Sequence, residues 1–170
     1  MQGKVQVYTG DGKGKTTAAL GLALRASGAD LKTYIGQFIK SGDTSEATAI
    51  DQIPNITIEH YGTGRFVLGS PNEEDIKMAD EGLMKLHQAM QSGKYDIVIA
   101  DEANCAVKAE LFPAERLLNL IDQKPDNLEL IFTGRGADQK LIDRADLVSE
   151  IQPVKHYYEK GVPSRKGIED

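Results

Sequence analysis

The chain has 170 residues, of which 40% are hydrophobic and 27% charged, a composition typical of a globular protein. A chain of this length can bury one proper core, so we expect residues 1–170 to form a single domain. Acidic side chains outnumber basic ones by 26 to 20, giving a formal net charge of −6. This balance argues against a general binder of nucleic acid or of anionic membranes, because either would usually carry a basic stripe.

The cellular compartment is indicated by one cysteine and by the absence of long apolar runs. Cys105 is the only cysteine, so no internal disulfide can form and a reducing compartment is favoured. No charged-then-apolar leader precedes Val5, and no apolar run approaches the ~18 residues that span a bilayer. We therefore expect a cytoplasmic protein.

Hydrophobic periodicity predicts six strands that alternate with helices. The predicted strands are Val5–Tyr8, Thr33–Phe38, Thr57–Tyr61, Ile97–Ala100, Leu128–Thr133 and Leu147–Ile151. The predicted helices are Thr16–Ser27, about Asn72–Gln91, Ala114–Gln123 and Asp138–Arg144. Such alternation is typical of a mostly parallel sheet that is covered by helices on both faces.

The longest predicted helix carries the clearest local signals. Ser70 and Glu73 form an S-x-x-E capping box, with Pro71 at the first helical position. One face of this helix is predicted to be buried, because apolar residues recur at helical spacing: Ile76, Ala79, Leu83, Leu86 and Met90.

Two longer segments show no regular periodicity, Ser41–Asn55 and Gly62–Ser70. Both follow the carboxyl ends of predicted strands, which is where ligands bind in open α/β sheets. They are therefore candidate substrate loops or lids. The basic tail after Pro153 is either a frayed terminus or a segment that folds over the substrate.

The stretch GDGKGKTT between the first strand and the first helix predicts a phosphate-binding loop. Glycines let successive backbone N–H groups converge on an anion, and the helix N-terminus adds further donors and a positive dipole end. The usual G-x-x-x-x-G-K-[ST] pattern would place glycine at position 9, where this chain has Thr9. The residues expected to hold the phosphates are Gly10, Asp11, Gly12, Lys13, Gly14, Lys15, Thr16 and Thr17.

Within this loop, Lys15 is placed to reach the terminal phosphates and the Thr16 hydroxyl to ligate Mg²⁺. Together with the strand–helix alternation, this motif predicts a three-layer P-loop NTPase-like (RecA-like) α/β fold with a mostly parallel central sheet.

Two other strand ends carry residues that suit a nucleotide site. The strand in YDIVIADEAN ends in Asp101 and Glu102, either of which can hold magnesium directly or through water. The strand in LELIFTGRGAD is followed by Arg135 between two glycines, and this arginine can aim its guanidinium at phosphate oxygens or lie in a surface turn. His60, His87 and His156 form no zinc-type spacing.

The residues alone leave the reaction open. Glu102 can activate water, which would make the protein an ATPase or a nucleotide switch. Alternatively, an acceptor attacks phosphorus, as in a small-molecule kinase, or attacks carbon, as in a transferase that releases the phosphate chain.

The chain closely resembles the P-loop ATP:corrinoid adenosyltransferases nearly from end to end. The resemblance rests on ordered motifs: GDGKGKTTAALGLALRASG, YIGQFIKSG, YGTGRFV, YDIVIADEAN, IFTGRGADQKLIDRADLVSEI and PVKHYYEKG. It implies transfer of the 5′-deoxyadenosyl group of ATP to the cobalt(I) of a reduced corrinoid, with release of triphosphate. It further implies a homodimer and an electron-donating reductase as partner.

By this resemblance, Lys15, Glu102 and Arg135 are the catalytic residues, and Thr16, Glu102 and Asp101 hold magnesium. Lys13 neutralises the leaving triphosphate, and Arg25 reaches back to the phosphates or to a partner subunit. The corrinoid is expected to contact Phe66, Arg65 and Phe38, with Phe66 crowding out the lower axial ligand of cobalt.

Overall fold

The computed structural model describes residues 2–42, 44–64 and 71–169. Six strands form one sheet in the order β3-β2-β4-β5-β1-β6, and every neighbouring pair is parallel. The strands are β1 (Val5–Thr9), β2 (Thr33–Phe38), β3 (Ile56–Tyr61), β4 (Ile97–Asp101), β5 (Glu129–Thr133) and β6 (Leu147–Glu150). The sheet confirms the predicted α/β, P-loop NTPase-like fold class.

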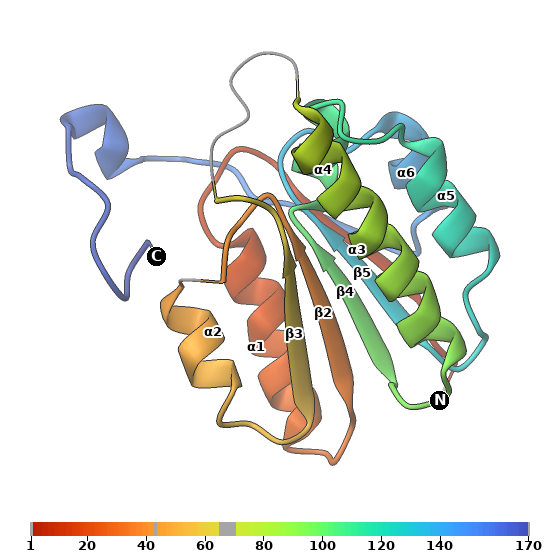
Figure 1. Cartoon of the computed structure of the whole chain (residues 1–170). Helices are drawn as coiled ribbons and strands as arrows, with labels where there is room; N and C mark the ends of the chain where they lie inside the picture. The colour runs from red at the N-terminus through yellow and green to blue at the C-terminus, as the bar shows by residue number, and fades with distance from the viewer. Residues whose placement is uncertain (1, 43, 65–70, 170) are drawn as a thin grey trace.

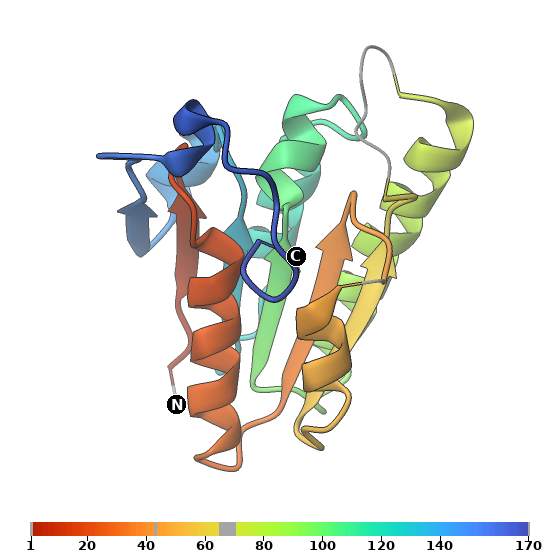
Figure 2. The same cartoon turned by 90° about the vertical axis from the view of Figure 1, so that its left-hand side faces the viewer.

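Helices cover both faces of the sheet, as Figures 1 and 2 show. One face carries α1 (Lys15–Ser27) and α2 (Ser45–Ile50). The other face carries α3 (Glu73–Gln91), α4 (Ala103–Lys108), α5 (Glu115–Asp122) and α6 (Gln139–Arg144). A short 3₁₀ helix, η1 (Tyr157–Lys160), follows in the tail, and no helix among the described residues is long and apolar enough to cross a membrane.

The core lies in two clusters, one on each side of the sheet. Ala19, Ala23 and Ala26 of α1 pack on isoleucines of the sheet, and their small side chains let the helix approach the strands closely. The opposite cluster is larger and includes Phe38, Phe112 and Phe132. The strands β2 and β4 are buried along their whole length, so neither shows the alternation of buried and exposed residues typical of a half-exposed strand.

The strand order determines which loops meet. Parallel strands all point their carboxyl ends to the same edge of the sheet. Because β5 lies between β1 and β4, the loop after β1, the acidic end of β4 and the turn after β5 are neighbours at that edge (Figure 1).

Two helices were missed in the sequence, and the cap of a third was assigned to the wrong residue. The segment Ser41–Asn55, expected to be irregular, contains α2, and α4 follows Glu102 directly. The helix α3 begins at Glu73, and its cap is Asn72, whose side chain accepts from the Asp75 N–H at 2.9 Å. An asparagine at the N-cap satisfies a free N–H as well as a serine does, so the predicted box on Ser70, which lies outside the described residues, was wrong.

The buried face of α3 is also shifted from the prediction. Ala79, Leu83, Leu86 and Met90 are buried as expected, whereas Ile76 in the first turn is 37% exposed. Gly82 is buried instead, because α3 crosses β2 and β3 there at close range.

Candidate active site

The glycine-rich loop after β1 is held against the end of β6. Gly12 donates its N–H to the Ile151 carbonyl at 2.7 Å. A Cβ on Gly10 or Gly12 would lie 2.5 or 2.8 Å from the same carbonyl oxygen, and Gly10 and Gly14 have φ values of +92° and +119°. The glycines are therefore required both by this close approach and by left-handed backbone. The sequence predicted that these glycines let N–H groups converge on an anion, and gave no sign of the contact with Ile151.

Lys15, at the start of α1, turns its ammonium into the loop. Its Nζ donates to the Gly12 carbonyl at 2.7 Å, and the residue is 7% exposed. Burial lowers the pKa of Lys15, and the nearby positive charge of Arg135 lowers this pKa further. The positive charge of Arg135, in the turn after β5, therefore lies near that of Lys15, and a bound polyanion would relieve the repulsion between them.

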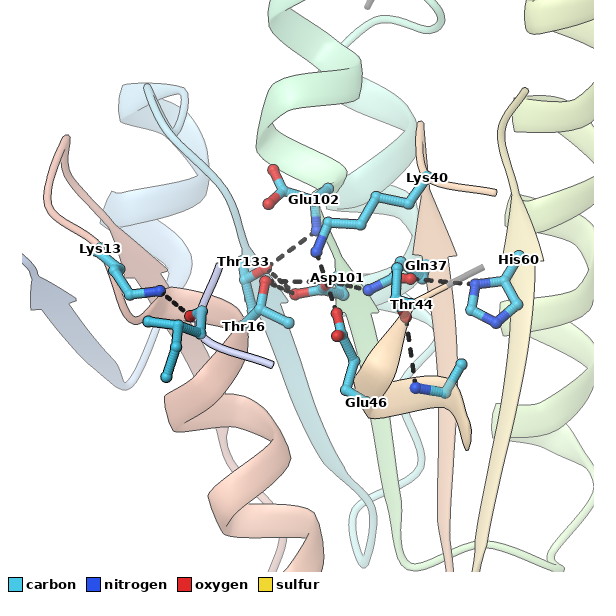
Figure 3. Close-up of polar contacts among 12 residues, drawn as sticks. Lys13, Thr16, Gln37, Lys40, Thr44, Glu46, His60, Asp101, Glu102 and Thr133 are labelled. Carbon is cyan, nitrogen blue, oxygen red and sulfur yellow. Dashed lines mark hydrogen bonds and ion pairs between the residues drawn. The ribbon is translucent and has the colours of Figure 1, made fainter. Parts of the chain in front are cut away.

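Asp101, at the end of β4, is the centre of a hydrogen-bond network (Figure 3). It is 1% exposed. Its carboxylate accepts from the Thr16 hydroxyl at 3.0 and 3.2 Å, from Thr133 Oγ1 at 2.6 Å and from Gln37 Nε2 at 2.8 Å. Because these bonds use both carboxylate oxygens, Asp101 orients Thr16 rather than facing the solvent itself.

This donor set fits a magnesium ion. Mg²⁺ prefers hard oxygen ligands in an octahedral arrangement and usually retains water. The Thr16 hydroxyl donates its hydrogen bond to Asp101, so the lone pairs of the Thr16 oxygen remain available to a metal ion. The Glu102 carboxylate lies at the same edge of the sheet (Figure 3). Thr16 and Glu102 are therefore suited to bind the ion directly. Asp101, whose oxygens already accept hydrogen bonds, is suited to act through Thr16 or through a bound water.

The turn that carries Glu102 is fixed by its backbone. Glu102 has a left-handed backbone with φ of +58°, and its N–H donates to Thr133 Oγ1 at 3.0 Å. Left-handed backbone in a non-glycine residue is uncommon and points to a local constraint. Here it turns the chain sharply from β4 into α4 and leaves the side chain half-exposed at the strand end.

Lys13 connects the loop to the C-terminal tail. Its Nζ donates to the Ile168 carbonyl and lies 3.7 Å from a Glu169 carboxylate oxygen. The neighbouring Asp11 and Thr17 are exposed. The tail therefore returns to the phosphate loop, and Figure 2 shows the C-terminus beside α1. Whether the tail folds over the substrate stays a prediction.

Two predicted site residues lie elsewhere. Phe38 is fully buried between Tyr61 and Phe112, with ring centroids 6.2 and 5.4 Å away; this placement contradicts a corrinoid contact, because its ring has no exposed surface. Arg25 is ten residues along α1 from Lys15, a rise of about 15 Å, so it does not reach the phosphate loop of its own chain. Arg65 and Phe66 lie outside the described residues.

Four polar residues near the site were not anticipated: Gln37, His60, Lys40 and Glu46. Gln37 of β2 is fully buried and links Asp101 to His60 Nδ1, which is 3.1 Å from Gln37 Oε1. Lys40 reaches Glu46 of α2 at 3.5 Å, and Ile39 before it has φ of +68°. The only signal for Gln37 was a polar residue inside an apolar run. No group of three potential metal-ligating His, Cys, Asp or Glu side chains was found among the described residues.

Comparison with known proteins agrees with this geometry. Residues 1–169 match the model of the family described as ATP:corrinoid adenosyltransferase BtuR/CobO/CobP. The chain belongs to this family. Its members are enzymes that act on ATP and a corrinoid, in which the adenosyl group passes to the corrinoid.

Several corrinoid adenosyltransferases are similar to this protein over nearly its whole chain. A corrinoid adenosyltransferase of Escherichia coli K12 is 32% identical over 169 residues, which cover 99% of this chain and 86% of the relative. The enzyme of Salmonella typhimurium gives the same identity and coverage. That of Pseudomonas aeruginosa is 32% identical over 170 residues, covering 99% and 84% of the two chains. The family match thus extends over nearly the whole adenosyltransferase chain.

Proposed function

We propose that this adenosyltransferase forms the cobalt–carbon bond with Mg-ATP held by the loop Gly10–Thr17, and that residues 1–170 act as one domain. The observation that supports the proposal is that the Lys15 ammonium turns into the loop, near the positive charge of Arg135 and next to the Thr16 hydroxyl that Asp101 orients. Two cations and an oriented hydroxyl at a helix N-terminus suit a triphosphate and its metal ion.

The reaction joins C5′ of ATP to cobalt. Cobalt(I) supplies the electron pair, the C5′–O bond breaks, and the triphosphate leaves with that bond's electrons. Since cobalt(I) is itself a strong nucleophile, the protein needs no base to activate it. Its residues position the two substrates and stabilise the charge that develops on the leaving group.

Lys13, Lys15 and Arg135 are the side chains assigned to the leaving triphosphate. Lys15 is already buried in the loop, where a charge interaction is screened less than at the surface. Lys13 is paired with Glu169 and the Ile168 carbonyl, so binding of triphosphate requires it to exchange these partners. The negative charge of a bound anion would raise the Lys15 pKa again, and the ammonium would therefore stay charged when triphosphate is bound.

Magnesium is proposed as the metal ion, with Thr16 and Glu102 as ligands and Asp101 in an outer position. When bound, it would neutralise charge on the phosphate chain. The chain's own part is to fix the Thr16 hydroxyl through Asp101, and to hold Glu102 at the end of β4 through its N–H bond to Thr133.

The remaining partners are proposed from the exposed surface and from the family. A homodimer is supported by exposed apolar side chains on α1 and on the edge strand β6, namely Leu24 at 59%, Leu147 at 45% and Val148 at 40%. Arg25, next to Leu24, is placed to act in a partner subunit. We also propose a cytoplasmic location, a reductase that supplies the electron, and a corrinoid contact through Arg65 and Phe66.

The test is product analysis with Mg-ATP and a chemically reduced corrinoid. We expect the spectrum of an adenosylated corrinoid and one equivalent of intact triphosphate. Formation of ADP and phosphate without a spectral change would instead support a nucleotide switch that uses Glu102 to activate water. A phosphorylated acceptor would indicate a kinase. Lys15→Ala should abolish any of these activities, so it tests the site and not the reaction.

A further inference from the structure

The first turn of α4 is tied to the turn after β5 at three points. Glu102 N–H donates to Thr133 Oγ1 at 3.0 Å, Asn104 Nδ2 donates to the Gly134 carbonyl at 3.2 Å, and Arg135 N–H donates to Cys105 Sγ at 3.2 Å. Each of three consecutive residues at the end of β5 thus has a partner in α4 or directly before it. This connection joins two elements that are about 30 residues apart in the chain.

Gly134 makes the contact between these elements possible. Its φ is +126°, and a Cβ on it would lie 2.9 Å from the Cys105 nitrogen and 3.1 Å from the Asn104 Cβ. Only glycine fits both this backbone conformation and this distance. The main chain of Arg135 is therefore brought directly against the Cys105 side chain.

The Cys105 thiol has a second partner in Glu102. The thiol is half-buried, and a hydrogen bond joins it to the Glu102 carboxylate. Because an ionised carboxylate only accepts hydrogen bonds, the thiol carries the proton of this bond. A neutral thiol donates one hydrogen bond and accepts another, so it can donate to Glu102 while its sulfur accepts from Arg135 N–H.

We propose that Cys105 is a positioning residue that couples Glu102 to Arg135, through a thiol that donates to the Glu102 carboxylate and accepts from the Arg135 N–H. This inference rests on the proposed function, in which Glu102 holds magnesium and Arg135 contacts the triphosphate. Cys105 touches neither substrate; it sets the relative placement of the two residues that do.

A purely structural role for Cys105 makes a different prediction. If the side chain only fills space in α4, its loss lowers thermal stability and leaves ligand affinity unchanged. If it positions Glu102 and Arg135, its loss weakens binding of both the metal ion and the triphosphate. Inorganic triphosphate is the suitable probe, because it contacts the proposed site without requiring a corrinoid.

The experiment compares Cys105→Ala and Cys105→Ser with Val107→Ala. Serine retains one donor and one acceptor at the same position, whereas alanine removes both. Val107 lies on α4, is half-buried and packs against the large core cluster, so Val107→Ala controls for loosened packing of the helix. Calorimetric titration of the full chain measures the Kd of inorganic triphosphate with Mg²⁺ present and the Mg²⁺ concentration at half-saturation.

We expect Cys105→Ala to weaken triphosphate binding about two- to tenfold, the range for one hydrogen bond, and to raise the Mg²⁺ requirement as well. Cys105→Ser should recover most of this loss, and Val107→Ala should lower the melting temperature without altering either affinity. Wild-type affinity in Cys105→Ala, or an equal loss in Cys105→Ser, would overturn the inference while leaving the proposed function intact. If the wild-type protein binds no triphosphate, the proposed function itself is wrong.

Discussion

Gln37 and Asp101 lie side by side on neighbouring strands, and the Gln37 amide donates to the Asp101 carboxylate at 2.8 Å. An ionised carboxylate only accepts hydrogen bonds, so the NH₂ group of Gln37 faces Asp101 and its oxygen faces His60. His60 Nδ1, 3.1 Å from that oxygen, therefore carries a proton. A chain of hydrogen bonds thus runs from His60 of β3 through Gln37 of β2 to Asp101 of β4. Asp101 in turn orients the Thr16 hydroxyl.

Replacement of Gln37 by leucine should damage both stability and metal binding. The change removes one of the donors to a carboxylate that is 1% exposed, and leaving a buried polar group without its partner costs about 1–3 kcal/mol. We expect a lower free energy of unfolding in urea and weaker Mg-ATP binding, because Asp101 no longer holds Thr16 in one orientation.

The matched control is Ile35→Val, two residues earlier on the same strand and the same face, where Ile35 is also fully buried. It should cost about 1 kcal/mol of stability through the lost methyl group and leave Mg-ATP affinity unchanged. Equal Mg-ATP affinities in both variants would show that Gln37 is only a packing residue.

The Thr16 hydroxyl should decide the metal dependence of nucleotide binding. Thr16→Val keeps the shape of the side chain and removes the oxygen, so we expect the Mg²⁺ concentration at half-saturation of ATP binding to rise at least about tenfold. Thr16→Ser, which retains the hydroxyl, should stay close to wild type. The contrary result, equal Mg²⁺ dependence in Thr16→Val and wild type, would remove Thr16 from the proposed metal site.

The central part of this site could be predicted because its signals are local. The first strand, the glycine-rich loop and α1 follow each other directly, Asp101 ends β4, and Arg135 lies in the turn after β5. Parallel topology then brings these strand ends to one edge. The helices α2 and α4 were missed, since each has six residues and fewer than two turns carry too little periodicity to recognise.

Residues whose position depends on distant contacts were not predictable. The strand β2 is buried on both faces. The alternation of polar and apolar residues therefore could not predict that Phe38 points into the core. The length of α1, and not any motif, carries Arg25 away from the loop. The contact of Lys13 with the tail joins residues 155 positions apart, and no pattern in the sequence encodes such a pair.

The folded conformation of the C-terminal tail should depend on the Glu169 carboxylate. Its carboxylate accepts from the Arg165 N–H at 2.9 Å and from the Arg165 side chain at 3.0 and 3.2 Å. It also accepts from Tyr157 and lies near Lys13. Hydrogen bonds from Arg165 and then from Tyr157 lower the pKa of Glu169 to about 2. We expect Glu169→Gln to speed tryptic cleavage after Lys160 and Lys166, whereas Glu159→Gln, in the exposed η1 helix, should not.

The same contacts predict the pH dependence of the tail. Because the pKa of Glu169 is lowered in the folded tail, the ionised carboxylate stabilises the tail. This stabilisation is complete above the ordinary glutamate pKa near 4.5 and is lost as the pH falls toward about 2. Carbon-13 NMR of the side-chain carboxyl group should give a midpoint near 2 in the wild-type protein. A midpoint near 4.5 would mean that the tail is not held by this carboxylate in solution.

Replacing two helical glycines by alanine should change the stability of the protein in opposite directions. A Cβ added to Gly21, in α1, would meet no neighbouring atom within 4 Å, so Gly21→Ala should stabilise the protein by about 1 kcal/mol through helix propensity. Gly82, in α3, lies where a Cβ would be 2.7 Å from Phe38 and 2.8 Å from Tyr61. Both rings are held in place, Phe38 against Phe112 and Tyr61 by its hydroxyl contact with Tyr34 at 2.7 Å.

At Gly82 the overpacking should exceed the gain in propensity. Forcing an extra carbon into a well-packed core costs about 1–3 kcal/mol, against about 1 kcal/mol gained. We therefore expect Gly82→Ala to lower the melting temperature by several degrees, given about 2–4 °C per kcal/mol for a chain of this size, while Gly21→Ala raises it. If both substitutions raised the melting temperature, α3 would not approach β2 and β3 as closely as Gly82 now permits.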